Sequence, residues 1–192
     1  MKPTEVLKHE HRVIEQVLDC LERIAARCRS DGRLERGSAR EVLDFFRSYA
    51  DTCHHGKEEQ HLFPMLEARG FSGSSGPVAV MRYEHEQGRE LIQGMDRAID
   101  GAGAGDSAAC AEFVHNARAY AALLRAHIQK EDNCLFPMAD QALSDADQVA
   151  LADCFEQVER DELEPGIHDK YVRLANELTR RNNVAGKATG IV

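Results

Sequence analysis

The stretch HHGKEEQHLFPM (His54–Met65) places three histidines, a lysine and two glutamates directly before an apolar tetrapeptide. A second stretch, HIQKEDNCLFPM (His127–Met138), repeats a histidine, the lysine, a glutamate and the tetrapeptide in the same register. Residues four apart lie on the same face of an α-helix, so an imidazole and a carboxylate would stand side by side in each stretch. The sequence therefore predicts two chelating pairs, His54 with Glu58 and His127 with Glu131.

Helical periodicity extends through most of the chain, and the alternation typical of strands is scarce. Apolar residues recur every three or four positions along four segments, 7–28, 43–65, 78–99 and 113–135. The glycine-rich loops GFSGSSGP (70–77) and GAGAGD (101–106) follow the second and third segments. This pattern predicts an all-α protein, an up-down-up-down antiparallel four-helix bundle. Each apolar stripe includes a histidine at a core position, namely His11, His54, His85 and His127.

An internal repeat defines the expected domain organisation. Equivalent residues of the two halves are offset by 73 or 74 positions, as for His11 and His85 or Pro64 and Pro137. We expect two helical hairpins, about 4–69 and 77–142, that form one bundle domain over residues 1–142. Residues 143–181 are predicted to be a helical extension packed on the bundle, with a lid or a partner surface as the alternatives. Residues 182–192 are predicted to be a disordered tail.

Composition argues against several classes of function. The chain has 192 residues and a net charge of −9, with acidic and basic residues interspersed and no basic stripe, so we expect no nucleic-acid partner. No window approaches the length of about 20 apolar residues that spans a bilayer, and the N-terminus has no signal-peptide core, so no membrane association is expected and the protein is predicted to be cytoplasmic. Its six cysteines, which lack C-x-x-C spacing, are predicted to be free thiols. Cys53 and Cys134 lie near the repeated motifs, where redox sensing or sulfur ligation is the functional alternative to simple core packing.

Six side chains that could bind metal are expected to meet inside the bundle: His11, His54, Glu58, His85, His127 and Glu131. Ionised glutamates in an apolar core are costly unless they are paired or bound to a cation. Two ions bridged by the glutamates would satisfy both carboxylates, and a mixture of imidazole and carboxylate favours iron or manganese over calcium or magnesium. With two histidines, an oxygen of each glutamate and an oxo or hydroxo bridge, each ion keeps one octahedral position open for dioxygen, peroxide or nitric oxide.

The motifs resemble the hemerythrin family, in particular its bacterial hemerythrin-like branch with the HHE cation-binding domain. The resemblance covers approximately residues 4–140 and rests on the Glu–His dipeptides at 10–11 and 84–85 and on HHGKEEQHLFP and HIQKEDNCLFP. It implies a four-helix bundle with a non-haem di-iron centre held by the same six residues. The chain departs from respiratory hemerythrins, which have an H-x-x-x-H pair on the third helix, because Arg89 stands four residues after His85. This departure favours redox chemistry or iron handling over reversible oxygen transport.

Two main hypotheses of function follow. The first is a di-iron protein that binds or reduces a small oxidant, with catalase-like or nitric oxide-directed activity left open. The second is a non-catalytic iron store, donor or sensor, which would have a redox or iron-transfer partner. A zinc-stabilised scaffold is the weaker third alternative, and the oligomeric state is left open.

Several neighbouring residues are assigned secondary roles. Tyr120, seven residues before His127, is either a phenolate ligand or a packing residue. His55, Glu59 and His61 are interpreted as outer or solvent-facing groups, because the pair His55–Glu59 does not recur as such in the second stretch. Gly88 either leaves room for a small ligand or permits close helix packing, and Pro64 and Pro137 are expected to end or kink their helices.

Overall fold

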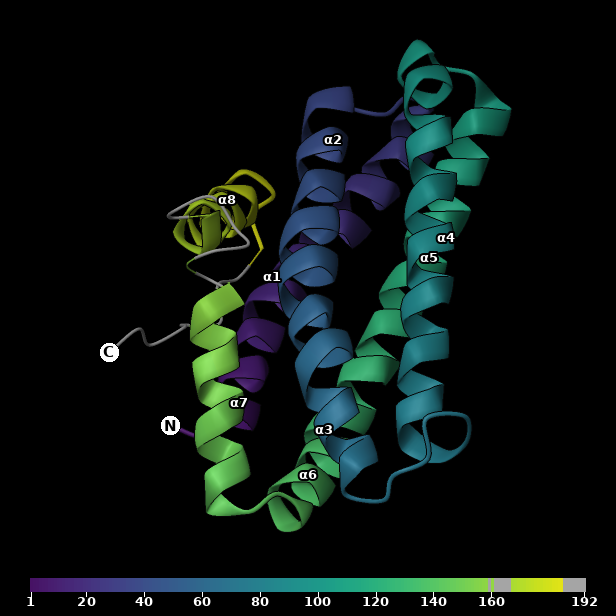
Figure 1. The fold of residues 1–192 in the computed structure, drawn as a ribbon. Coiled ribbons are helices and arrows are strands. Elements are labelled where there is room, and N and C mark those ends of the chain that lie inside the picture. The colour runs from purple at the N-terminus through teal and green to yellow at the C-terminus, as the bar shows by residue number, and fades with distance from the viewer. Residues whose placement is uncertain (159, 161–166, 185–192) are drawn as a thin grey trace.

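The computed structural model describes residues 1–158, 160 and 167–184. All regular secondary structure in this part of the chain is helical, which confirms the prediction of an all-α protein. Figure 1 shows long helices packed side by side, with shorter helices at one end and along one flank. No helix among the described residues is both long and apolar enough to cross a bilayer.

Four helical runs form the body of the molecule (Figure 1). The first is α1 (Pro3–Asp31), and the third is α4 (Gly76–Ala104). The second and fourth runs are each composed of α-helical and wider π-helical segments. The second consists of α2 (Arg36–Phe45), η1 (Phe46–His55), η2 (Glu58–Leu62) and α3 (Phe63–Ala68). The fourth consists of α5 (Ser107–Lys130), η3 (Glu131–Leu135) and α6 (Phe136–Ala142).

The connections between the runs lie at opposite ends of the molecule. The turns from α1 to α2 and from α4 to α5 are at one end, and the loop from α3 to α4 is at the other (Figure 1). Gly32 and Gly105 follow α1 and α4 with φ angles of 65° and 87°, in the left-handed region that glycine adopts without a steric penalty. Pro77 lies in the first turn of α4, where a missing N–H costs no helical hydrogen bond.

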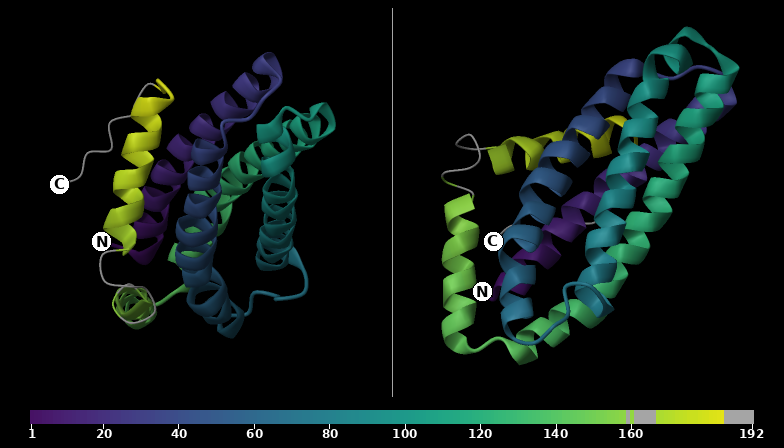
Figure 2. Two further views of the ribbon diagram at one scale, coloured as in Figure 1. Left: turned by 90° about the horizontal axis from the view of Figure 1, so that it is seen from above. Right: turned by 45° about the vertical axis from the view of Figure 1, so that its right-hand side comes forward.

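Two further helices cover one flank of the bundle. The first, α7 (Asp145–Gln157), begins with a capping box between Ser144 and Asp147, and the second is α8 (Ile167–Arg181). Both helices pack against α1 (Figure 2). Leu151 of α7 and Leu178 of α8 are both fully buried, so each helix contributes to an apolar cluster of the core. Residues 161–166 of the predicted extension and residues 185–192 of the predicted tail lie outside the described residues.

The prolines of the two LFP motifs do not end their helices. The N–H of Phe63 donates to the carbonyl oxygen of Glu58, and the N–H of Phe136 donates to that of Glu131, so each bond spans five residues instead of four. Each bond closes a π-helical turn, after which the chain continues as α3 or α6 beyond its proline. Wide turns of this kind occur frequently at functional sites. Here they begin at the two predicted glutamate ligands.

The apolar core is divided into two main clusters. One includes Ile14, Tyr49, Ile92 and Leu124, and the other includes Leu7, Leu62, Met81 and Leu135. Each of the four runs contributes to both clusters. Five of the six predicted ligands lie at sequence positions between these contributions, for example His11 between Leu7 and Ile14, and the sixth, His127, directly precedes Ile128, the last residue that its run contributes to the first cluster. The helices therefore present a polar layer between two apolar ones.

Candidate metal centre

All six predicted ligand residues are buried and lie together in this polar layer. None of them is more than 2% exposed. They fall into two groups whose candidate ligand atoms lie within 4.8 Å of one another. One group is His11, His54, Glu58 and Glu131, and the other is His55, Glu58, His85 and His127. Glu58 belongs to both, as expected of a carboxylate between two ions.

The two glutamates lie between the histidines of the two groups. The carboxylate of Glu58 is 3.8 Å from Nε2 of His54 and 3.5 Å from Nε2 of His85. The carboxylate of Glu131 is 3.2 Å from Nε2 of His11 and 3.2 Å from Nε2 of His127. Each carboxylate therefore faces one histidine from each half of the repeat.

A second carboxylate orients each of the four imidazoles from its outer side. Nδ1 of His54 lies 2.8 Å from Oε2 of Glu10, and Nδ1 of His127 lies 3.0 Å from Oε2 of Glu84. An ionised carboxylate only accepts hydrogen bonds, so Nδ1 carries the proton and Nε2 presents its lone pair toward the centre. Glu10 and Glu84 are the glutamates of the Glu–His dipeptides, to which sequence reasoning assigned no role.

The same arrangement holds for the other two histidines. Nδ1 of His11 lies 2.8 Å from Oδ1 of Asp132, and Nδ1 of His85 lies 2.6 Å from Oε1 of Glu59. Glu59 and Asp132 occupy equivalent positions of the two stretches, so the carboxylate register recurs although the histidine at position 55 does not. The interpretation of Glu59 as an outer group agrees with this geometry. The sequence interpretation did not recognise that Asp132 has the same role in the second stretch.

The lysine and the phenylalanine that the two stretches share contact the candidate ligands or their outer carboxylates. The ammonium of Lys57 donates to Glu10 over 2.5 Å, and that of Lys130 donates to Glu84. The ring of Phe136 stacks on His11 with centroids 5.5 Å apart, and Phe63 stacks on His85 at 5.9 Å. The lysine and phenylalanine of each stretch thus position groups that contact the candidate ligands.

Several inward-facing atoms have no hydrogen-bond partner among the described residues. These buried atoms are Nε2 of His11 and of His54 and both carboxylate oxygens of Glu58 and of Glu131. Such atoms are rare in proteins because each costs about 1–3 kcal/mol when it is left unsatisfied. They cluster at one point and are all metal-ligand types, so the donor set fits a pair of transition-metal ions.

The distance between His85 and His127 and the pKa shifts of these two histidines are also features expected at a cation-binding site. Nε2 of His85 lies 3.1 Å from Nε2 of His127, and two lone pairs cannot approach so closely without a proton or a metal ion between them. Burial would lower the pKa of His127, but Glu131 and Glu84 beside it raise it to about 9. Burial and the neighbouring His55 and His127 lower the pKa of His85.

The pKa values of the two central carboxyl groups are also shifted in opposite directions. Burial and repulsion from Glu131 raise the pKa of Glu58 well above its usual value. Burial would also raise the pKa of Glu131, but His127 and His11 lower it well below the usual value. Without a cation, burial and mutual repulsion therefore disfavour the ionisation of both carboxyl groups at once. Bound cations would allow both carboxylates to ionise.

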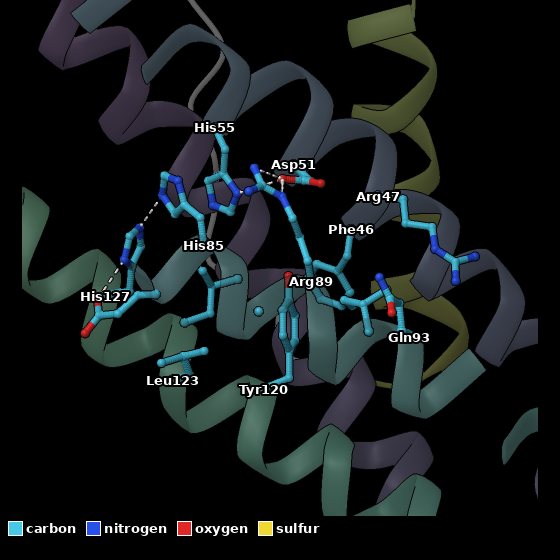
Figure 3. Close-up of a pocket in the computed structure, with 14 residues that line it drawn as sticks. Phe46, Arg47, Asp51, His55, His85, Arg89, Gln93, Tyr120, Leu123 and His127 are labelled. Atoms are coloured by element: carbon cyan, nitrogen blue, oxygen red, sulfur yellow. Dashed lines mark hydrogen bonds and ion pairs between the residues drawn. The ribbon is translucent and has the colours of Figure 1, made fainter. Parts of the chain in front are cut away.

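A cavity of about 210 Å³ adjoins the group of His55, His85 and His127 (Figure 3). Its other lining residues include Gly88, Ile92 and Leu124, together with the polar side chains of Arg89 and Tyr120. The histidines of the other group, His11 and His54, do not line it. The cavity therefore approaches the candidate metal centre from one side only.

His55 is a residue whose position sequence reasoning did not predict. It is 5% exposed, and its ring stacks on that of His85 with centroids 3.8 Å apart and planes 13° apart. It had been interpreted as an outer or solvent-facing group because the second stretch has Ile128 in its register. The solvent-facing alternative is wrong because the side chain is buried, and His55 belongs to one of the two candidate metal groups.

The other residues considered from the sequence lie outside the two groups. Tyr120 is buried against Phe46, and burial raises the pKa of its hydroxyl, which favours the packing interpretation over a phenolate. All six cysteines are free thiols, as predicted, and neither Cys53 nor Cys134 belongs to a candidate metal group of the described residues. His61 is half-buried and also lies outside these groups.

The helices surround a buried layer of imidazoles and carboxylates that could hold metal ions. This combination of fold and site is typical of metal-binding helical bundles. The model of the hemerythrin HHE cation-binding domain matches residues 2–139, which is most of the chain. The chain therefore belongs to this family. The matched region contains all six predicted ligands, the outer carboxylates and both LFP motifs.

Similar proteins were found by sequence, whereas no solved structure matches the chain. The chain is 27% identical over 155 residues to an uncharacterized protein of Mycobacterium bovis and to one of Mycobacterium tuberculosis. Each match covers 81% of this chain and 60% of the mycobacterial protein, so the chain spans less than two thirds of these relatives. It is also 35% identical over 89 residues to the iron-sulfur cluster repair protein YtfE of an Enterobacter species, covering 45% of this chain and 40% of that protein.

Proposed function

We propose that this protein holds two iron ions in the polar layer and uses them to bind or reduce a small oxidant such as dioxygen, peroxide or nitric oxide. The proposed ligands are His11, His54, Glu58, His85, His127 and Glu131. The observation that most supports this function is the position of the cavity, because it adjoins buried imidazoles whose Nε2 atoms face a candidate ion. The connections at alternate ends also support the up-down-up-down bundle expected of the family.

The side chains of the layer provide a preorganised site. Glu10, Glu59, Glu84 and Asp132 hold the four imidazoles in one tautomer, with Nε2 directed inward. Glu58 and Glu131 supply negative charge between the two groups and would bridge the ions. When bound, a pair of iron ions supplies electron transfer to an oxidant and a positively charged position for it. The apolar clusters cover this layer from above and below.

The cavity favours a ligand of a few atoms. Its volume of about 210 Å³ accommodates more than one water-sized molecule. Ile92 and Leu124 provide apolar wall, whereas the guanidinium of Arg89 donates to Asp51 and Glu59 at the cavity. A larger organic substrate would have to displace these paired side chains. Small diatomic molecules and peroxide fit without such movement.

The second candidate function is iron handling without catalysis, as a store, donor or sensor. It is favoured by the similarity to YtfE, which is named as an iron-sulfur cluster repair protein. The two functions differ in the fate of the metal. An oxidant-binding protein retains its ions through repeated cycles, whereas a donor releases them to an acceptor.

Metal analysis and ligand binding distinguish these functions. The purified protein is loaded anaerobically with Fe(II), freed of excess metal and analysed for iron. It is then exposed to air, azide, nitric oxide or peroxide while its visible spectrum and oxygen evolution are recorded. Two ions per chain and bands that change with added ligand are expected. Stoichiometric zinc without visible absorption would overturn the proposal, and iron that is released rapidly to a chelator would favour iron handling.

A further inference from the structure

The two candidate metal groups contain unequal numbers of histidines. His11 and His54 serve one group, whereas His55, His85 and His127 serve the other. The repeat accounts for four of these residues, but the position equivalent to His55 is Ile128, which is buried in the apolar core. His55 therefore breaks the symmetry of the centre.

The local backbone explains how two consecutive histidines both face the interior. His54 and His55 are the last residues of the π-helical segment η1. A wider turn rotates the chain less per residue, so neighbouring side chains diverge less than in an α-helix. Their ring centroids are 5.7 Å apart, and the ring of His54 lies beside that of His11. The ring of His55 lies beside that of His85 (Figure 3).

His55 is oriented in the same manner as the four predicted histidines. Its Nδ1 lies 3.3 Å from Oδ1 of Asp51, and Asp51 accepts a hydrogen bond of 2.9 Å from Arg89. An outer carboxylate on Nδ1 leaves Nε2 available to a cation. Each of the five imidazoles in the layer thus has its own outer carboxylate partner.

We propose that His55 is a direct ligand of the ion that lies beside the cavity, in addition to His85, His127 and Glu58. This inference rests on the proposed di-metal site and adds a seventh protein ligand to it. The two ions are then chemically different, with three imidazoles at one and two at the other. Because His55 itself lines the cavity, a small ligand that enters from there competes with His55 for the same ion.

Cobalt(II) binding tests the ligand role without depending on activity, because its visible bands report coordination number. Apoprotein is titrated with Co(II) for the full-length wild type and for His55→Ile, which installs the residue of the second hairpin in the same register. We expect the wild type to bind two ions. In His55→Ile, one binding step should weaken about tenfold or more while the other is retained, since even outer partners contribute about 10–100-fold to metal affinity.

A cavity-forming variant separates ligation from packing. In His55→Ala, free imidazole should restore the weakened Co(II) step, because the adjoining cavity admits a molecule of that size. The same addition should leave His55→Ile unchanged, since its side chain fills the space. Azide should bind the iron-loaded His55→Ala protein more tightly than the wild type, because one competitor has been removed. His61→Ile is the matched control and should bind both ions as the wild type does.

The possible outcomes are distinguishable. Unchanged affinities and Co(II) spectra in His55→Ile would overturn the role of His55 and leave the di-metal site intact. Failure of imidazole to restore binding in a folded His55→Ala protein would also count against ligation. A wild-type protein that binds fewer than two ions would instead refute the proposed function itself. Helix content and thermal unfolding of each apoprotein establish that the variants are folded.

Discussion

Glu10 and Glu84 perform the same task in the two halves of the repeat. Each carboxylate is near Nδ1 of a histidine and accepts a hydrogen bond from a lysine, Lys57 for Glu10 and Lys130 for Glu84. Their surroundings nevertheless differ. The side chains of Lys57 and Glu10 are 0% and 3% exposed, whereas those of Lys130 and Glu84 are 43% and 12% exposed.

Neutralising these two carboxyl groups should have unequal effects on stability. Glu10→Gln removes a charge beside a fully buried ammonium and should cost about 3 kcal/mol, whereas Glu84→Gln should cost about 1 kcal/mol because water solvates Lys130. Both changes should weaken metal binding about 10–100-fold, because both disturb an outer partner of a ligand. Urea unfolding of the apoproteins and metal titration measure the two effects. Equal losses of stability would contradict the importance of the burial of Lys57.

Removing a central glutamate should abolish the two-ion site. Glu58→Ala takes away the carboxylate common to both candidate groups, so we expect iron content well below two ions per chain. The holoprotein should also lose stability, about 2.7 kcal/mol for each ion formerly present at about 100 times its dissociation constant. Glu131→Ala should behave similarly, and His61→Ala should retain both ions. Full iron occupancy in Glu58→Ala would refute the ligand assignment.

Enlarging Gly88 should obstruct the cavity without displacing metal. A Cβ atom at this position would meet Tyr120 at 3.5 Å, an ordinary contact, so Gly88→Ala should fold and gain up to about 1 kcal/mol from helix propensity. Gly88→Leu should fill more of the cavity and slow azide binding further. Stopped-flow absorbance of iron-loaded proteins measures the rate, with iron content as the control. An unchanged rate in fully loaded Gly88→Leu would mean that ligands reach the ions by another route.

Tyr120 should act through packing and not as a ligand. Burial raises the pKa of its hydroxyl, and its ring lies against Phe46 with centroids 4.9 Å apart. Tyr120→Phe should therefore retain two ions and the wild-type visible spectrum. Iron content and absorbance provide the measurement. Loss of a charge-transfer band on this substitution would establish phenolate ligation instead.

The docking of α7 should depend on pH through Asp147. This carboxylate accepts two hydrogen bonds from Arg69 and two from Ser144, one from its hydroxyl and one from its backbone N–H, and these bonds lower its pKa below the usual 3.8. The stabilisation is therefore present above pH 3.8 and declines as the pH falls below that value toward the folded-state pKa. Asp147→Asn should be less stable than the wild type at pH 7, and the difference should shrink below pH 3.8. Urea unfolding across this range tests it, with exposed Asp153→Asn as the control.

The sequence allowed the principal ligand candidates to be identified because periodicity and duplication are local properties. His54 and Glu58 share a helix face wherever that helix packs, and the recurrence at His127 and Glu131 separates this pattern from an isolated buried histidine. The sequence also contained a signal for the outer carboxylates. Glu10, Glu84, Glu59 and Asp132 recur in repeat register, but a carboxylate on a helix edge is indistinguishable from a solvated one until its partner helix is placed.

The backbone path of the second and fourth runs could not be predicted from their local residues alone. Pro64 and Pro137 were expected to end or kink their helices, and the first alternative is wrong, because both runs continue through a π-helical turn. A missing N–H predicts a lost α-helical bond but not how the preceding carbonyls find other donors. The same widening in η1 turns His55 inward, which its lack of a repeat partner had argued against.

The sequence alone determined the all-helical class, the duplication and the six residues most suited to hold metal, because these follow from spacing along individual helices. Tertiary packing determined the outer carboxylate of each histidine, the inclusion of His55 and the side from which the cavity approaches. The reason is physical. These features depend on distances between different helices, and such distances are set only when the apolar clusters above and below the polar layer close around it.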